Sequence, residues 1–131
     1  MKGKIKGTFE LTVESHFSAA HKLRDYNGAC SRLHGHNFNV QVTIHGEELN
    51  NQGMLYDFRE IKKYLKDTLD ELDHNFLNEL SPFIKENPTS ENTAKWIFKQ
   101  IDSLIGKEKP RINVKSVTVF ESPRAYVKYS E

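Results

Sequence analysis

Two histidines separated by a single residue, with the chain's only cysteine shortly before them, form the densest group of reactive side chains in this sequence. They lie in the segment Cys30-Ser31-Arg32-Leu33-His34-Gly35-His36. Neutral imidazole is the commonest nitrogen ligand for zinc, and a thiolate can act as a metal ligand, a nucleophile or a proton-transfer group. A further histidine, His21, precedes the segment. The group therefore points to metal binding, to proton transfer, or to both.

The two segments that carry these histidines show the period of two that is typical of half-buried strands. Their apolar side chains alternate with polar ones, namely Phe9, Leu11, Val13, Phe17 and Ala19 in the first segment and Phe38, Val40, Val42 and Ile44 in the second. Because alternate residues of a strand share a face, His21, His34 and His36 are all predicted on the core side. His16 and His45 fall on the polar faces, and we exclude them as ligands.

Three histidine ligands on two paired strands would fill three corners of a tetrahedral zinc site and leave the fourth open. A catalytic zinc requires that open position, because water or a substrate oxygen must bind there. If Cys30 were the fourth ligand, the protein would instead be a non-catalytic module with a closed, structural zinc held by one cysteine and three histidines. Spacing alone does not exclude this alternative. If Cys30 is not a ligand, nearby cationic side chains and the metal would favour its thiolate, which would suit an acid/base role.

Asp73 and His74 are adjacent and follow a predicted helix over residues 58–72. A carboxylate beside an imidazole can act as a proton-transfer pair. A histidine is also favoured at a helix C-terminus by the helix dipole, without any catalytic role. Both interpretations remain open from the residues themselves.

Glu121 alternates with Val117 and Val119, so its carboxylate is predicted to point into an apolar face. An unpaired charge there would be costly, which implies a buried partner or a ligand. A carboxylate can accept two parallel hydrogen bonds from a ring edge such as that of a pterin or a guanine. Glu91 lies in the first turn of a predicted helix, where the dipole alone explains an acidic residue.

Two helices and a closing hairpin complete the predicted fold. Asp57 resembles the start of a capping box for the helix over 58–72, and Thr89 or Ser90 is predicted to cap a second helix that ends at Gly106. The apolar stripes are Phe58, Ile61, Leu65, Leu69 and Leu72 in the first helix and Ala94, Ile97, Phe98, Ile101, Leu104 and Ile105 in the second. Residues 114–122 and 125–129 are predicted as strands. The order β-β-α-α-β-β predicts an α+β fold, a four-stranded antiparallel sheet with two helices packed on one face.

Length and composition limit the possible functions. The 131 residues fit a single domain, 1–131, with a core over about 8–129. A net charge of +1 gives no electrostatic reason to expect nucleic acid or a membrane as a partner. A lone cysteine cannot form an intrachain disulfide, the basic start Met1 to Gly7 lacks the apolar run of a signal peptide, and no spanning segment is present. We therefore expect a cytoplasmic protein.

Five short motifs together resemble the 6-pyruvoyltetrahydropterin synthase superfamily. They are Phe17-Ser18-Ala19-Ala20-His21, Cys30-Ser31-Arg32-Leu33-His34-Gly35-His36, Leu72-Asp73-His74-Asn75-Phe76-Leu77-Asn78, Asn87-Pro88-Thr89-Ser90-Glu91 and Val119-Phe120-Glu121-Ser122-Pro123. A cysteine four positions before His-Gly-His is most similar to the bacterial 6-carboxy-5,6,7,8-tetrahydropterin synthase branch. The animal biopterin enzymes place more residues between the cysteine and the first histidine.

The resemblance implies a site and a reaction. Zinc would bind the three histidines, Cys30 would transfer protons with help from Asp73 and His74, and Glu121 would anchor the pterin. Thr89, Ser90 and Glu91 are expected to contact the substrate, and the triphosphate contacts are expected among Lys22, Arg24, Arg32 and Arg124.

The implied reaction converts 7,8-dihydroneopterin triphosphate to 6-carboxytetrahydropterin, with release of acetaldehyde and triphosphate, in queuosine and deazapurine biosynthesis. The alternative within the superfamily is 6-pyruvoyltetrahydropterin synthesis. The implied architecture is a tunnelling fold (T-fold), in which subunits join their sheets as trimers or hexamers with active sites between subunits.

Overall fold

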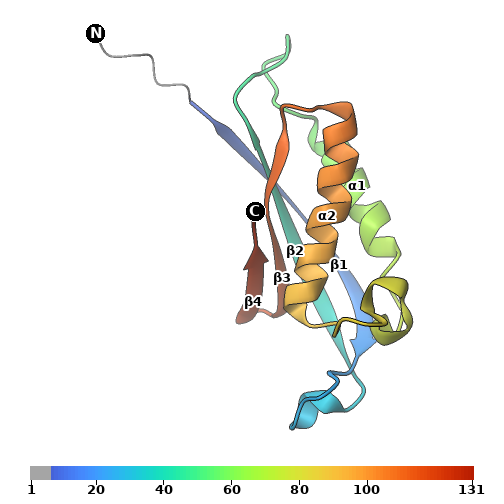
Figure 1. Cartoon of the computed structure of the whole chain (residues 1–131). Coiled ribbons are helices and arrows are strands. Elements are labelled where there is room, and N and C mark those ends of the chain that lie inside the picture. The colour runs from blue at the N-terminus through green and yellow to red at the C-terminus, as the bar shows by residue number, and fades with distance from the viewer. Residues whose placement is uncertain (1–6) are drawn as a thin grey trace.

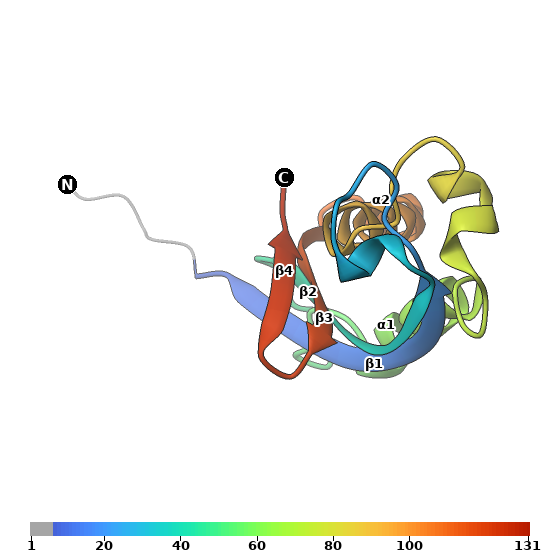
Figure 2. The same cartoon turned by 90° about the horizontal axis from the view of Figure 1, so that it is seen from below.

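The computed structural model describes residues 7–131; residues 1–6, which hold most of the basic start, lie outside the described part. The elements are β1 (Phe9–His21), β2 (His34–Gly46), α1 (Phe58–Asp70), α2 (Ser90–Glu108), β3 (Asn113–Ser122) and β4 (Ala125–Tyr129). The strands form one antiparallel sheet in the order β1-β2-β3-β4. Both helices cover the same face of this curved sheet (Figures 1 and 2). The predicted element order and α+β class are confirmed.

The alternation of side chains in β1 and β2 produces one buried and one exposed face. Val13, Phe17 and Ala19 are buried in β1, and the apolar residues from Phe38 to Ile44 are buried in β2. Phe17 stacks on Phe38 with ring centroids 4.7 Å apart and an interplanar angle of 14°. This pair closes the end of the core on which the three histidines lie.

The helices begin where the sequence predicts. The Asp57 carboxylate accepts a hydrogen bond from the Arg59 N–H at 2.8 Å, and the Thr89 hydroxyl accepts one from the Asn92 N–H at 3.1 Å. Their ends differ from the prediction, since α1 stops at Asp70 and α2 continues through Gly106 to Glu108.

The prediction of the apolar stripes is wrong for two residues. Phe58 is 51% exposed and Leu104 is 38% exposed, whereas the other stripe residues are buried. Phe58 is the first residue of its helix, where the chain is still approaching the sheet. Within residues 7–131, no helix combines the length and the apolar character needed to cross a bilayer.

The outer edge of β1 is partly covered by the chain itself. The Asp73 carboxylate accepts from the Ser18 N–H at 2.8 Å, the His74 N–H donates to the Ser18 carbonyl at 2.6 Å, and the Ala20 N–H donates to the Asn75 carbonyl at 3.0 Å. His74 has a positive φ of 58°, a conformation uncommon outside glycine, and this turn lays residues 73–76 along the strand. The end of β1 that carries His21 is therefore held on both sides.

The Phe17–Phe38 stack provides a test of the core. Replacing Phe17 by alanine removes a fully buried ring and should lower the free energy of unfolding by about 3–5 kcal/mol. Phe9→Ala, in the same strand at a site 45% exposed, should change it by no more than about 0.5 kcal/mol. Urea denaturation of the two variants measures both values, and equal effects would contradict the difference in burial between Phe17 and Phe9.

Candidate metal and substrate site

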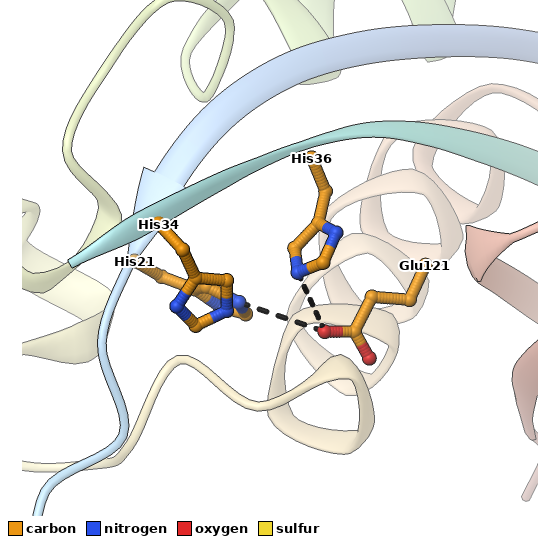
Figure 3. A group of neighbouring side chains, drawn as sticks. All are labelled: His21, His34, His36 and Glu121. Atoms are coloured by element: carbon orange, nitrogen blue, oxygen red, sulfur yellow. Dashed lines mark ion pairs between the residues drawn. The ribbon is translucent and has the colours of Figure 1, made fainter. Parts of the chain in front are cut away.

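The three predicted histidines converge at one end of the sheet. His21 is the register partner of His34 across the β1–β2 ladder, and His36 follows on the same face of β2. With Glu121 of β3 they form a group whose ligand atoms all lie within 4.8 Å of one another (Figure 3). His16 and His45 do not belong to this group, as their strand phase predicts.

Among residues 7–131 the Nε2 atoms of His21, His34 and His36 make no hydrogen bond, and the nearest charged group is the Glu121 carboxylate, which lies 2.9 Å from His36 Nε2. The other ring nitrogen is in use in two of the three residues. His21 Nδ1 lies 2.7 Å from the Pro88 carbonyl, and His34 Nδ1 lies 2.7 Å from the Arg32 carbonyl. A carbonyl only accepts, so each Nδ1 carries the proton and each Nε2 presents a lone pair.

Burial gives a second reason for neutral imidazole at this site. His21 is 2% exposed, and this desolvation is the largest cause that lowers its pKa below the ordinary value. The neighbouring imidazoles act in the same direction, whereas the bond to Pro88 and the Glu121 charge oppose it. A neutral ring with a free Nε2 is the form that binds a metal ion.

These residues fit a zinc ion. Buried polar atoms are nearly always hydrogen-bonded, so three orphaned nitrogens aimed at one point call for a common partner. Three imidazole nitrogens match the ligands of a zinc site with an open fourth position, and other imidazole-binding metals share the preference. The donor set could therefore hold a divalent metal ion.

Glu121 lies on the same face as the histidines, and they are the partners that the sequence analysis implied for its carboxylate. One carboxylate oxygen is 2.9 Å from His36 Nε2 and 3.7 Å from His21 Nε2, and the side chain is 34% exposed. The other oxygen accepts a long hydrogen bond of 3.4 Å from the Ser90 hydroxyl. The β3–β4 register shifts between Phe120 and Ser122, so Glu121 is the extra residue of a bulge.

A pocket of about 510 Å³ opens next to the metal-binding group, within the size range of small-molecule sites. His21 and Glu121 line one side of it, and Thr89, Ser90 and Glu91 line it at the start of α2. The structure thus brings the predicted substrate-contact residues to one cavity beside the histidines.

Cys30 lies outside the metal-binding group. It is the central residue of a short 3₁₀ helix, Ala29–Ser31, in the loop between β1 and β2, and its carbonyl accepts from the Leu23 N–H at 2.8 Å. Its thiol is free and half-buried. The fourth donor next to the histidines is Glu121, so the geometry does not support the closed site of one cysteine and three histidines.

Asp73 and His74 form a pair, with Asp73 Oδ2 2.8 Å from His74 Nδ1. The hydrogen bond from the Ser18 N–H is the largest cause that holds the pKa of the Asp73 carboxyl below its usual range, and the bond to His74 is the second. The His74 ring is 83% exposed. Among residues 7–131 the side-chain hydrogen bonds and ion pairs of these two residues reach Ser18 and each other, and none reaches Cys30. One chain therefore does not assemble all of the predicted site residues through direct contacts.

The carbonyls of Pro88 and Arg32, which orient two of the histidines, were missed by the sequence reasoning. Backbone acceptors leave no mark in residue types or spacing. The signal for these acceptors in the sequence is the predicted core position of His21 and His34, because a buried imidazole needs a hydrogen-bond partner for its second nitrogen.

A curved antiparallel sheet, helices on one face and a three-histidine group beside a pocket are the features of a T-fold enzyme with a candidate metal site. The family model described as 6-pyruvoyl tetrahydropterin synthase matches residues 10–131. The chain belongs to this family, whose members are lyases of pterin metabolism.

Known relatives agree on the fold and differ in activity. The chain is 35% identical to 6-carboxy-5,6,7,8-tetrahydropterin synthase of Bacillus subtilis over 127 residues, covering 93% of this chain and 85% of the relative. It is 39% identical over 93 residues to dihydroneopterin monophosphate aldolase of Pyrococcus furiosus, covering 70% and 73%. The structure of Caenorhabditis elegans 6-pyruvoyl tetrahydropterin synthase superposes with a TM-score of 0.84 at 28% identity, covering 95% and 96%. The expected T-fold is confirmed by this likeness.

Metal content separates the roles of histidine and cysteine. His34→Ala should reduce bound zinc from about one ion per chain to almost none, because two protein imidazoles hold the ion poorly. Cys30→Ala should retain the zinc, and His16→Ala serves as a control for loss of a histidine outside the group. Atomic absorption on the dialysed proteins measures each content. Loss of zinc in Cys30→Ala would revive the structural-zinc alternative.

Proposed function

We propose that the protein is a zinc-dependent 6-carboxy-5,6,7,8-tetrahydropterin synthase. Its substrate is 7,8-dihydroneopterin triphosphate, which reacts with one water to give 6-carboxytetrahydropterin, acetaldehyde and triphosphate. The observation that carries the proposal is the group of three orphaned imidazole nitrogens beside a pocket that contains a carboxylate. The four-residue step from Cys30 to His34 and the name of the Bacillus subtilis relative favour this reaction within the family.

His21, His34 and His36 hold the metal in this proposal. A bound zinc ion supplies Lewis-acid polarisation of the oxygens on the substrate's side chain. The Pro88 and Arg32 carbonyls hold two of the rings in the tautomer that leaves Nε2 unprotonated. The chain thereby presents its ligands without having to rearrange them.

Glu121 anchors the pterin ring in the pocket. Its carboxylate can accept two parallel N–H bonds from the amidine-like edge of the ring, with Thr89, Ser90 and Glu91 around it. Ser90 already donates to Glu121, so the hydroxyl helps to orient the carboxylate. The ring position in turn places the side chain of the substrate towards the histidines.

Cys30, Asp73 and His74 move protons between the substrate's side chain and the ring. Asp73 is fixed by the Ser18 N–H and holds His74 at 2.8 Å, the geometry of an oriented acid/base pair. Because no contact in one chain links this pair to Cys30, we propose that the complete site forms between subunits of a trimer or hexamer. The open part of the β1 edge is available for such sheet-to-sheet pairing.

The proposed setting is the cytoplasm, in queuosine and deazapurine biosynthesis. A reducing compartment keeps a catalytic thiol such as Cys30 free. The pocket and charge pattern give no reason to add nucleic acid or a membrane as a partner.

Product analysis tests the reaction. The zinc-loaded protein given 7,8-dihydroneopterin triphosphate should release acetaldehyde and a carboxylated tetrahydropterin. A 6-pyruvoyl product without acetaldehyde would favour the alternative synthase activity. Full zinc content with no pterin turnover would overturn the proposal, and Cys30→Ala should lower kcat by about 10²–10⁴-fold while the zinc stays bound.

Subunit complementation tests the shared site. Cys30→Ala and His74→Ala should each be nearly inactive alone. After the two are unfolded together and refolded as a mixture, part of the activity should return, because some interfaces then combine an intact Cys30 with an intact His74. A mixture of Cys30→Ala with Cys30→Ser is the control and should stay inactive. Absence of recovery in the mixed oligomer would contradict the inter-subunit arrangement.

A further inference from the structure

The chain that leaves β1 after His21 is held by two asparagine side chains instead of a neighbouring strand. Asn78 Oδ1 accepts from the Lys22 N–H at 3.0 Å, and its Nδ2 donates to the Lys22 carbonyl at 2.9 Å. Asn87 makes the same pair of bonds with Arg24, at 2.7 and 2.9 Å. Each amide therefore satisfies both backbone groups of one residue, as a paired strand would.

The Arg24 side chain also joins these segments, because it donates hydrogen bonds to backbone carbonyls of the segment 78–86. Its guanidinium donates to the carbonyls of Phe83 at 2.7 Å and of Asn78 and Glu86 at 3.2 Å. A guanidinium is always charged and has a planar fork of donors, so it can bind several carbonyls at once. With three of its five N–H donors used in this way, Arg24 has fewer donors left for the triphosphate contact expected from the sequence.

The segment held by Asn87 and Arg24 leads directly to the Pro88 carbonyl, which accepts a hydrogen bond from His21. Asn87 directly precedes Pro88, which is buried and whose carbonyl lies 2.7 Å from His21 Nδ1. On the other side, Asn92 Nδ2 donates to the Asn87 carbonyl at 2.9 Å, and Thr89 caps α2. The Pro88 carbonyl is therefore fixed between the bonds of Asn87 and the first turn of the helix.

We propose that Arg24, Asn78 and Asn87 are positioning residues that set the Pro88 carbonyl and, through it, the orientation of the His21 Nε2 atom towards the metal. The segments that they join are 22–24 and 78–87, which lie far apart in the sequence and meet beside the end of β1 (Figure 1). The inference rests on the proposed metal site and adds residues that touch neither metal nor substrate. Partners of metal-binding histidines usually contribute about 10–100-fold to metal affinity.

Zinc affinity in the folded protein is the decisive measurement. Asn87→Ala removes both amide bonds to Arg24 and should weaken Zn²⁺ binding by about tenfold, measured by competition with a chromophoric chelator. The visible spectrum of the Co²⁺-loaded variant should differ from that of the native protein, because the His21 ring is free to turn. Arg24→Lys keeps the charge but loses the fork, and it should change both readouts in the same direction.

The control is Asp102→Ala, which removes a comparable half-buried bond from a side chain to the Val114 N–H, 3.0 Å long, at the opposite end of α2. It should lower the unfolding temperature while leaving zinc affinity and the cobalt spectrum unchanged. If Asn87→Ala does not fold, Arg24→Lys decides the question by the same two readouts. Variants that bind zinc as the native protein does would overturn this inference alone, whereas a native protein without zinc affinity would overturn the proposed function as well.

Discussion

The site depends on the register of β1 against β2, which pairs His21 directly with His34. A shift of one residue would turn one of these imidazoles to the opposite face and leave the other without its neighbour. The register is secured by the buried alternation of both strands and by the Phe17–Phe38 stack four residues away from each histidine. The hydrophobic core and the metal-binding group are therefore specified by the same pairing.

A second constraint is the cost of placing polar nitrogens where no water reaches them. The chain satisfies Nδ1 of His21 and His34 with backbone carbonyls and leaves the Nε2 atoms of all three rings without a hydrogen bond. Such groups lower the stability of the metal-free fold, and a bound cation converts that cost into affinity. The bonds of Arg24 to Asn87 and to the Phe83 carbonyl hold the segment before Pro88, whose own carbonyl contacts His21.

Apart from Cys30, which lies in the loop between β1 and β2, the candidate site residues of one chain fall into two groups. The histidines, Glu121 and the pocket at the start of α2 form one group, and the Asp73–His74 pair beside the edge of β1 forms the other. Both are anchored to β1, by His21 on the buried face and by Ser18 at the edge. A multimer that places one subunit's edge near another's pocket, as proposed above, would bring the groups together.

The sequence by itself determined the strands, the two helix caps and the shared face of the three histidines. These features depend on periods of two and 3.6 residues and on local capping, so each is encoded within a few neighbouring positions. The resemblance of five short motifs added the roles of Cys30, Asp73, His74 and Glu121. Only the tertiary structure decided that the partners of Glu121 are His36 and His21. It alone also joined Asn87 to Arg24 and Pro88 to His21. Such contacts involve backbone groups of residues more than 60 positions apart, for which residue type and spacing hold no signal.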